Sequence, residues 1–173
     1  TQNPIEQEGT YPLPEAQVDR FMLKVVVGYP SRAEERNILD SFDHTDSEKL
    51  VTPITDPRDI LAARKVIDTI YMDDKIKDYI VSLVYATREP QSFQLELKEY
   101  IETGASPRAT INLKAVSRCL AFLGGRGYVT PDDVKASVID VMRHRLRISY
   151  EAEAEGITSE DIIRKILDTV PVP

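Results

Sequence analysis

Three polar side chains of this sequence, Asn3, Arg20 and Arg108, belong to types that act on phosphate groups. A guanidinium neutralises the charge that develops when a phosphoryl group is transferred, and a carboxamide can orient the attacking water. Each residue also has a purely structural interpretation. The elements that hold these side chains must therefore be considered before any chemistry is assigned to them.

Arg20 follows Asp19 and directly precedes an almost continuously apolar segment, Phe21–Val27. This composition predicts a strand buried on both faces of a parallel sheet, whose edge would hold the Arg20 guanidinium rigidly. The alternative is a local ion pair with Asp19 or Glu15. The rest of the chain has mainly helical patterns, so we expect the strand's neighbours to lie in a preceding part of the protein. Residues 1–30 would then be the end of a truncated α/β core.

Arg108 lies in the first turn of a helix that Ser106 and Pro107 open and that Gly124 and Gly125 end. A cation at this position opposes the helix macrodipole, so another group should compensate for it. A phosphate oxygen between the helix N-terminus and the guanidinium would do so, and so would an acidic side chain from elsewhere. Both interpretations remain open at this point.

Asn3 precedes a proline, and an Asn-Pro turn is the structural alternative to an Asn3 carboxamide that orients water. No phosphate loop of the form G-x-x-x-x-G-K-[ST] occurs in the sequence. The glycine cluster Gly124–Gly127 follows a helix, which predicts a helix stop and a turn. A basic group lies at the end of a later helix, where positive charge favours a capping role. Its members are Arg143, His144, Arg145 and Arg147.

The remaining pattern is mainly α, with helix starts marked by hydroxyl or acidic caps and by proline. Helices are predicted from Ser31 to Phe42, from Asp56 to Tyr71, from Ile76 to Ala86, from Ser106 to Leu123, from Thr130 to Arg145 and from Ser159 to Val170. A polar connection is expected over 43–57, and two short strands at Tyr128-Val129 and Ile148–Tyr150. Residues 91–104 mix helix and strand spacing and receive no assignment.

The composition is that of a soluble globular protein, with 42% hydrophobic residues and a formal net charge of −7. Such a charge repels phosphate backbones and disfavours nucleic acid as a partner. Cys119 is expected to be a buried small hydrophobe in a reducing compartment. His44 stands alone in a polar segment, and no zinc-ligand spacing is present. No apolar run is long enough to span a membrane.

Several segments taken together closely resemble the MoxR family of AAA+ ATPases, and the resemblance covers the whole chain. The segments that carry it are Thr1–Gln17, Asp19-Arg20-Phe21, Gly104–Ala109, Tyr128–Val134 and Arg143-His144-Arg145. The resemblance implies an end of the α/β core at residues 1–30 and an all-helical lid over 31–173. It also implies that Asn3 is the sensor-1 residue, Arg20 the arginine finger offered to a neighbouring subunit, and Arg108 the sensor-2 arginine.

Membership of that family would make the full-length protein an ATPase that uses ATP and Mg²⁺ in a ring, expected to be a hexamer in the cytoplasm. The family further implies chaperone-like action on client proteins, often beside proteins with von Willebrand A domains. The phosphate loop and the magnesium-binding acids are absent from this sequence, so we expect the chain alone to be inactive and to hold no tightly bound nucleotide. A non-catalytic helical interaction module is the alternative. Helix-turn-helix binding of DNA is disfavoured, because Asp132 and Asp133 would face the phosphates.

Overall fold

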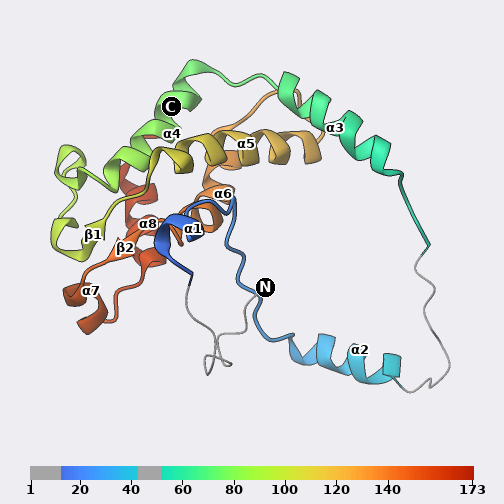
Figure 1. The fold of residues 1–173 in the computed structure, drawn as a ribbon, viewed down its shortest axis with the longest axis horizontal. Helices are drawn as coiled ribbons and strands as arrows, with labels where there is room; N and C mark the ends of the chain where they lie inside the picture. Colours follow the sequence, from blue (N-terminus) through green and yellow to red (C-terminus); the bar gives the residue numbers. More distant parts are fainter. Residues whose placement is uncertain (1–12, 43–51) are drawn as a thin grey trace. The chain divides into compact units, whose positions relative to one another are not determined.

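The computed structural model of the protein describes residues 13–42 and 52–173 (Figure 1). These residues belong to two units. The first unit contains the chain up to Lys24 together with Thr69–Pro173, and the second contains Val25–Asp68. The structure is mainly helical, as the sequence predicts. The expected domain boundary at residue 30 stays a prediction.

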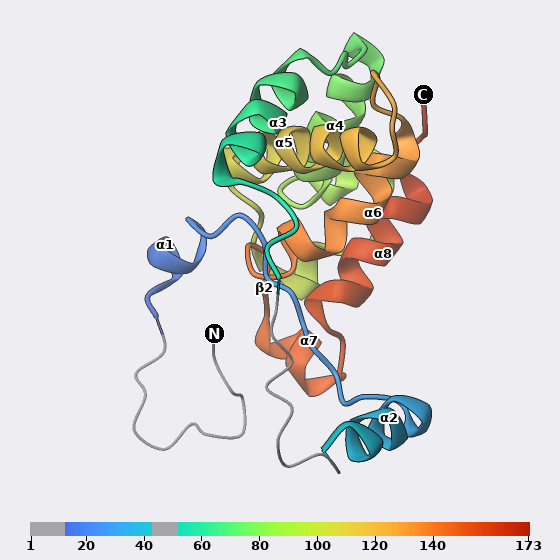
Figure 2. The same cartoon turned by 90° about the vertical axis from the view of Figure 1, so that its right-hand side faces the viewer.

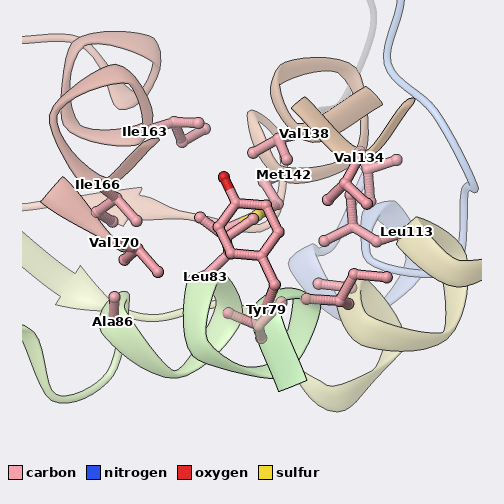
Figure 3. Close-up of a cluster of buried hydrophobic side chains, with 14 of the residues drawn as sticks. Tyr79, Leu83, Ala86, Leu113, Val134, Val138, Met142, Ile163, Ile166 and Val170 are labelled. Carbon is pink, nitrogen blue, oxygen red and sulfur yellow. The ribbon is translucent and has the colours of Figure 1, made fainter. Parts of the chain in front are cut away.

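Four helices form the core of the first unit: α4 (Asp74–Ala86), α5 (Pro107–Leu123), α6 (Pro131–Met142) and α8 (Ser159–Thr169). α6 packs against both α5 and α8, and α4 packs against the same two helices (Figure 2). Apolar side chains from all four helices meet between them (Figure 3). They include Tyr79, Leu83, Leu113, Val134, Val138, Met142, Ile163 and Ile166. This packing supplies most of the apolar burial of the described chain.

The start of each of these helices is fixed by a local side-chain cap, as the sequence indicates. Asp73 accepts a hydrogen bond from the backbone N–H of Lys75 at 2.9 Å, and Ser106 accepts one from that of Arg108 at 3.2 Å. Thr130 and Thr158 each begin a capping box with the acidic residue three positions later. Such caps satisfy amide groups that have no partner within the helix.

Between α4 and α5 the chain forms two short 3₁₀ helices, η1 (Pro90–Phe93) and η2 (Lys98–Tyr100), and the strand β1 (Ile101–Thr103). β1 pairs antiparallel with β2 (Arg147–Ile148), and the short helix α7 (Tyr150–Ala154) follows. The region that the sequence left unassigned is thus a mixture of turns and one strand. The predicted strand at Ile148–Tyr150 begins and ends earlier than expected, and Tyr128 forms only an isolated bridge with Tyr71. α6 ends at Met142, one turn before the predicted end.

The segment that precedes this core differs from its prediction. A short helix, α1 (Glu15–Val18), was not expected, and the predicted strand Phe21–Val27 is wrong, because residues 23–31 have no helix or strand structure. A strand requires a partner, and among residues 13–42 and 52–173 the segment makes only one ladder-like contact, from Lys24 N to Asp140 O at 2.9 Å. The apolar side chains stay exposed, with Val25 at 63%.

The second unit contains α2 (Arg32–Phe42) and most of α3 (Pro57–Thr69). The predicted capping box of α2 is confirmed, because the N–H of Ser31 donates to Glu34 at 2.7 Å and Ser31 accepts from the N–H of Glu34 at 3.4 Å. Asp56 caps α3 by accepting from the N–H of Arg58 at 2.7 Å. No described residue of Val25–Asp68 is buried. Residues 43–51, with His44 and most of the predicted connection, lie outside the described residues.

Candidate functional site

The carboxylate of Asp19, just after α1, is the centre of a cluster of polar side chains. It accepts hydrogen bonds from Ser106 Oγ at 2.9 and 3.0 Å, one to each carboxylate oxygen. It also accepts from Arg108 Nη1 at 3.0 Å and from Arg145 Nε at 3.2 Å. One carboxylate thus joins the start of α5 to the turn after α6.

Arg145 is the most deeply buried member of this cluster, and none of its side chain is exposed. Besides the carboxylate, its guanidinium donates to the carbonyl oxygens of Asp19 at 2.9 Å and of Met22 at 3.3 Å, and to that of Phe21. It also donates to the carbonyl of Val141 near the end of α6. A buried guanidinium is tolerated only when its donors are satisfied, and here carbonyls and one carboxylate satisfy them.

His144, next to Arg145 in the chain, makes a further contact with the same segment. Its Nε2 lies 3.0 Å from the carbonyl oxygen of Phe21. A carbonyl can only accept, so Nε2 carries the proton. Burial lowers the pKa of His144 below its ordinary value of 6.5, although the Phe21 carbonyl opposes this, and the charges of Arg145 and Lys24 lower it further. The ring is therefore neutral at neutral pH.

The Asp19 carboxylate is ionised over the physiological range. Partial burial would raise its pKa, but the hydrogen bonds from Ser106 and Arg108, together with the positive charges of Arg145 and Arg108, outweigh this effect. The pKa of Asp19 is accordingly lowered from the ordinary 3.8. Two cations around one carboxylate leave the cluster with a net positive charge.

Arg108 lies where the sequence predicted, in the first turn of α5 behind the Ser106 cap. Of the two interpretations that the sequence left open, the described residues contain the acidic partner, Asp19. The contact uses only Nη1, and 53% of the Arg108 side chain is exposed. The rest of the guanidinium remains available to an anion. The first amide groups of α5 are not, because Pro107 has no N–H and those of Arg108 and Ala109 donate to Ser106.

Arg20 lies beside Asp19 but does not join the cluster. Its side chain is exposed and has no hydrogen bond or ion pair with any residue of 13–42 and 52–173. The local ion pair that the sequence offered as an alternative is absent from this part of the chain, because Asp19 is occupied by the cluster and Glu15 pairs with Arg147 at 2.6 Å. The Arg20 guanidinium is therefore free to meet a ligand.

The path into α5 is fixed by a close approach at Gly104. A Cβ atom at this position would lie 2.6 Å from the carbonyl oxygen of Thr87, so only glycine fits. The next residue is held on both sides: Ala105 N–H donates to Thr87 Oγ1 at 2.9 Å, and Arg88 Nε donates to the Ala105 carbonyl at 2.8 Å. These contacts fix the backbone that carries Ser106 and Arg108.

Other residues singled out by the sequence have local roles. Gly124 and Gly125 end α5, as predicted, with Gly125 at φ +68°. Arg126 pairs with Asp133 at 2.5 Å, which is a structural role. Cys119 is a free thiol but is only half-buried, so the expectation of full burial is wrong. Asn3 lies outside the described residues.

The described part of the chain offers no group of three or more histidine, cysteine or acidic residues able to hold a metal ion. Within the same residues, none of the helices has the length and apolarity needed to cross a membrane. The candidate site consists of the exposed guanidinium groups of Arg20 and Arg108 and of the Asp19 cluster at the start of α5.

Sequence reasoning missed the role of Arg145, which was grouped with Arg143, His144 and Arg147 as helix-capping charges. Capping is part of what the group does, since Arg145 donates to Val141 and Arg143 Nε lies 3.4 Å from the carbonyl of Ile139. The contact to Asp19, however, joins residues 126 positions apart. The available signal was the uncompensated cation at Arg108, which required an acid from elsewhere.

Two family models match separate parts of the chain. Residues 94–166 match the AAA lid domain, and residues 1–23 match the model described as the ATPase family associated with various cellular activities. The lid match begins directly after η1 and ends within α8, so it contains Ser106, Arg108 and Arg145. The second match contains Asn3, Asp19 and Arg20.

Two curated proteins match this chain over its whole length. The chain is 42% identical over 174 residues to the protein named Chaperone MoxR1 of Mycobacterium tuberculosis, covering 100% of this chain and 46% of that protein. It is 40% identical to the uncharacterised protein YeaC of Bacillus subtilis, covering 100% of this chain and 52% of that protein. The chain thus spans about half the length of these relatives.

A solved structure agrees with the relationship. A crystal structure of a protein from Cytophaga hutchinsonii, provisionally described as an ATPase, matches with a TM-score of 0.94 and 43% sequence identity. The match covers 99% of this chain and 52% of that chain.

Proposed function

Because this chain contains an AAA lid domain and is a relative of the MoxR-family AAA+ ATPases, we propose that it is the C-terminal part of a longer enzyme that hydrolyses ATP. In this proposal, Arg20 is the finger that reaches the nucleotide of a neighbouring subunit in a ring. Arg108 senses the phosphates at the start of α5, and Asn3 orients the attacking water.

The observation that carries this proposal is the contrast between Arg20 and its neighbour Asp19. Asp19 is tied into the cluster by three side chains, whereas the Arg20 guanidinium is exposed and has no partner among the described residues. An arginine without an ion-pair partner is suited to neutralise the negative charge of a nucleotide bound to a neighbouring subunit. Arg108, half exposed at a helix N-terminus, supports a phosphate site in the same unit.

The full-length enzyme would use ATP with Mg²⁺, and the ring is expected to be a hexamer in the cytoplasm. Rotation of the lid would convert the nucleotide state into work on client proteins, alongside partners with von Willebrand A domains. Nucleic acid is not an expected partner, given the net charge of −7. This chain alone lacks a phosphate loop and is expected not to turn over ATP.

The test is steady-state ATP hydrolysis by the full-length protein with Arg20→Ala. Removal of an arginine finger costs about 1,000-fold or more in kcat, so turnover should collapse while ATP binding and assembly persist. Arg164→Ala is the matched control, because Arg164 is also exposed but pairs only with Glu160 and Asp161 on its own helix. Unchanged turnover in the Arg20 variant would reject the proposal and favour a non-catalytic interaction module.

A further inference from the structure

We infer that Asp19 is a positioning residue that couples Arg108 to Arg20, so that the state of the lid is transmitted to the group presented to a neighbouring subunit. This inference rests on the proposed function of Arg20 and Arg108. It assigns to Asp19 and its partner Arg145 a task that neither side chain performs by touching nucleotide.

The first support is connectivity. The Asp19 carboxylate holds Arg108 on one side at 3.0 Å and Arg145 on the other at 3.2 Å, while the next residue in the chain is Arg20. Arg108, the proposed sensor, is therefore joined to Arg20, the proposed finger, through the Asp19 side chain. A displacement of Arg108 toward a phosphate would change the hydrogen bonding of Asp19 directly.

The second support is the way in which the Arg20 backbone is held. Arg145 donates to the carbonyl oxygens of Asp19, Phe21 and Met22, which flank Arg20 on both sides. His144 contacts the Phe21 carbonyl as well, at 3.0 Å. The position of the Arg20 backbone is thus set largely by the turn after α6. The hydrogen bonds of Asp19 with Ser106 and Arg108, and that of Lys24 with Asp140, hold the same segment as well.

The third support is the charge of the cluster. One carboxylate shared by two guanidinium groups leaves one positive charge uncompensated, and Arg108 is the exposed member while Arg145 has no exposed side-chain area. An arriving phosphate can therefore engage Arg108, whereas Arg145 stays with Asp19 and the backbone. The exposed contact between Arg108 and Asp19 can therefore rearrange when a phosphate binds. The buried contact between Asp19 and Arg145 transmits that rearrangement to the backbone around Arg20.

The test uses mixed assemblies of the full-length protein. One subunit type carries Arg20→Ala and keeps its ATP-hydrolysing site, and the other has an intact Arg20 and carries a substitution that blocks its own hydrolysis without preventing ATP binding, so that its Arg108 still meets a phosphate. ATP hydrolysis by the mixture then takes place at the nucleotide sites of the first subunit type and requires Arg20 of the second. Asp19→Asn is introduced only into the finger-supplying type, with Glu15→Gln in the same place as the matched control, because Glu15 lies in α1 but pairs with Arg147.

We expect Asp19→Asn in the finger-supplying subunit to lower turnover about 10-fold or more, while Glu15→Gln does not. The dissociation constant for ATP, measured on the subunit type that carries Arg20→Ala, should be unchanged. Asp19→Glu keeps the charge and should restore part of the activity. It also serves as the second variant if Asp19→Asn fails to assemble.

Equal turnover for the Asp19→Asn and Glu15→Gln mixtures would overturn the coupling while leaving the proposed function intact. A loss that appears only when Asp19→Asn is placed in the subunit type that carries Arg20→Ala would overturn it too, because Asp19 would then serve Arg108 alone. Failure of the proposed function is recognised separately, since Arg20→Ala homomeric assemblies would then retain turnover.

Discussion

Both units of this chain contain helices with side-chain caps, yet the two units differ in burial. In the first unit, α4, α5, α6 and α8 surround a continuous core with many fully buried side chains. In Val25–Asp68, α2 and α3 have caps and amphipathic patterns, but no described residue is buried. Local signals thus specify where helices begin, whereas burial depends on residues distant in the sequence.

The largest expected effect on the free energy of unfolding comes from replacing a leucine by alanine in each unit, which tests the difference in burial directly. Leu113 is fully buried between helices, so Leu113→Ala should lower the free energy of unfolding by about 2–5 kcal/mol. Leu39 of α2 has 68% of its surface exposed, and Leu39→Ala should change that free energy by no more than about 0.5 kcal/mol. Urea denaturation of both variants measures the difference. Similar losses would mean that α2 is packed against other residues in solution.

An intermediate effect is expected when one hydrogen-bonded carboxylate is neutralised in each unit, Asp19 with distant partners and Glu34 with a partner in its own helix cap. Asp19→Asn leaves the buried Arg145 without its ion-pair partner and should cost about 1–3 kcal/mol in the unfolding free energy. Glu34→Gln in the exposed cap of α2 should alter helix content but not the main unfolding transition. Far-ultraviolet circular dichroism and urea denaturation separate the two outcomes.

The Asp19 contribution should depend on pH in one direction. Its pKa is lower in the folded protein than the ordinary 3.8, so the folded state binds fewer protons than the unfolded state near that pH. The stabilisation is fully present above 3.8 and is lost as the pH falls through the lower folded value. The difference between wild type and Asp19→Asn should therefore shrink below this pH. A difference that is constant with pH would contradict the assignment.

The smallest effect concerns the backbone before α5. Gly104→Ala places a Cβ atom 2.6 Å from a backbone oxygen and should lower the unfolding free energy by about 1 kcal/mol or somewhat more. Gly127→Ala is the matched control, since nothing lies within 4 Å of a Cβ at that position. Thermal denaturation suffices to compare them. Equal melting temperatures would show that the backbone at Thr87 can move away from the added Cβ atom without loss of stability.

The parts of the fold predicted from sequence are those determined by neighbouring residues. The caps at Ser31, Ser106 and Thr130 were identified from the residue types and their spacing alone, and each helix begins there. Short capping residues compete with the backbone in known ways, so such signals are local and strong. The family relationship was also recognised from local motifs and is confirmed.

The parts that sequence reasoning got wrong depend on distant partners. The apolar composition of Phe21–Val27 predicted a strand, but composition cannot supply the second strand that a sheet requires. The site shows the same limit. Arg108 was placed correctly in its helix, whereas its acidic partner, Asp19, lies 89 positions away and was considered only as a partner for Arg20. The roles of Asn3, Arg20 and Arg108 toward nucleotide stay predictions.

At Phe21 and Met22 the Arg20 segment is attached through carbonyl oxygens, so at these two positions the attachment does not depend on the side chain. Arg145 and His144 contact main-chain atoms of Phe21 and Met22, whose side chains are 57% and 50% exposed. A dye or spin label at either position would therefore leave the attachment intact. The same two positions can carry a spectroscopic reporter beside the proposed finger, and sequence drift there would be tolerated for as long as the backbone contacts are kept.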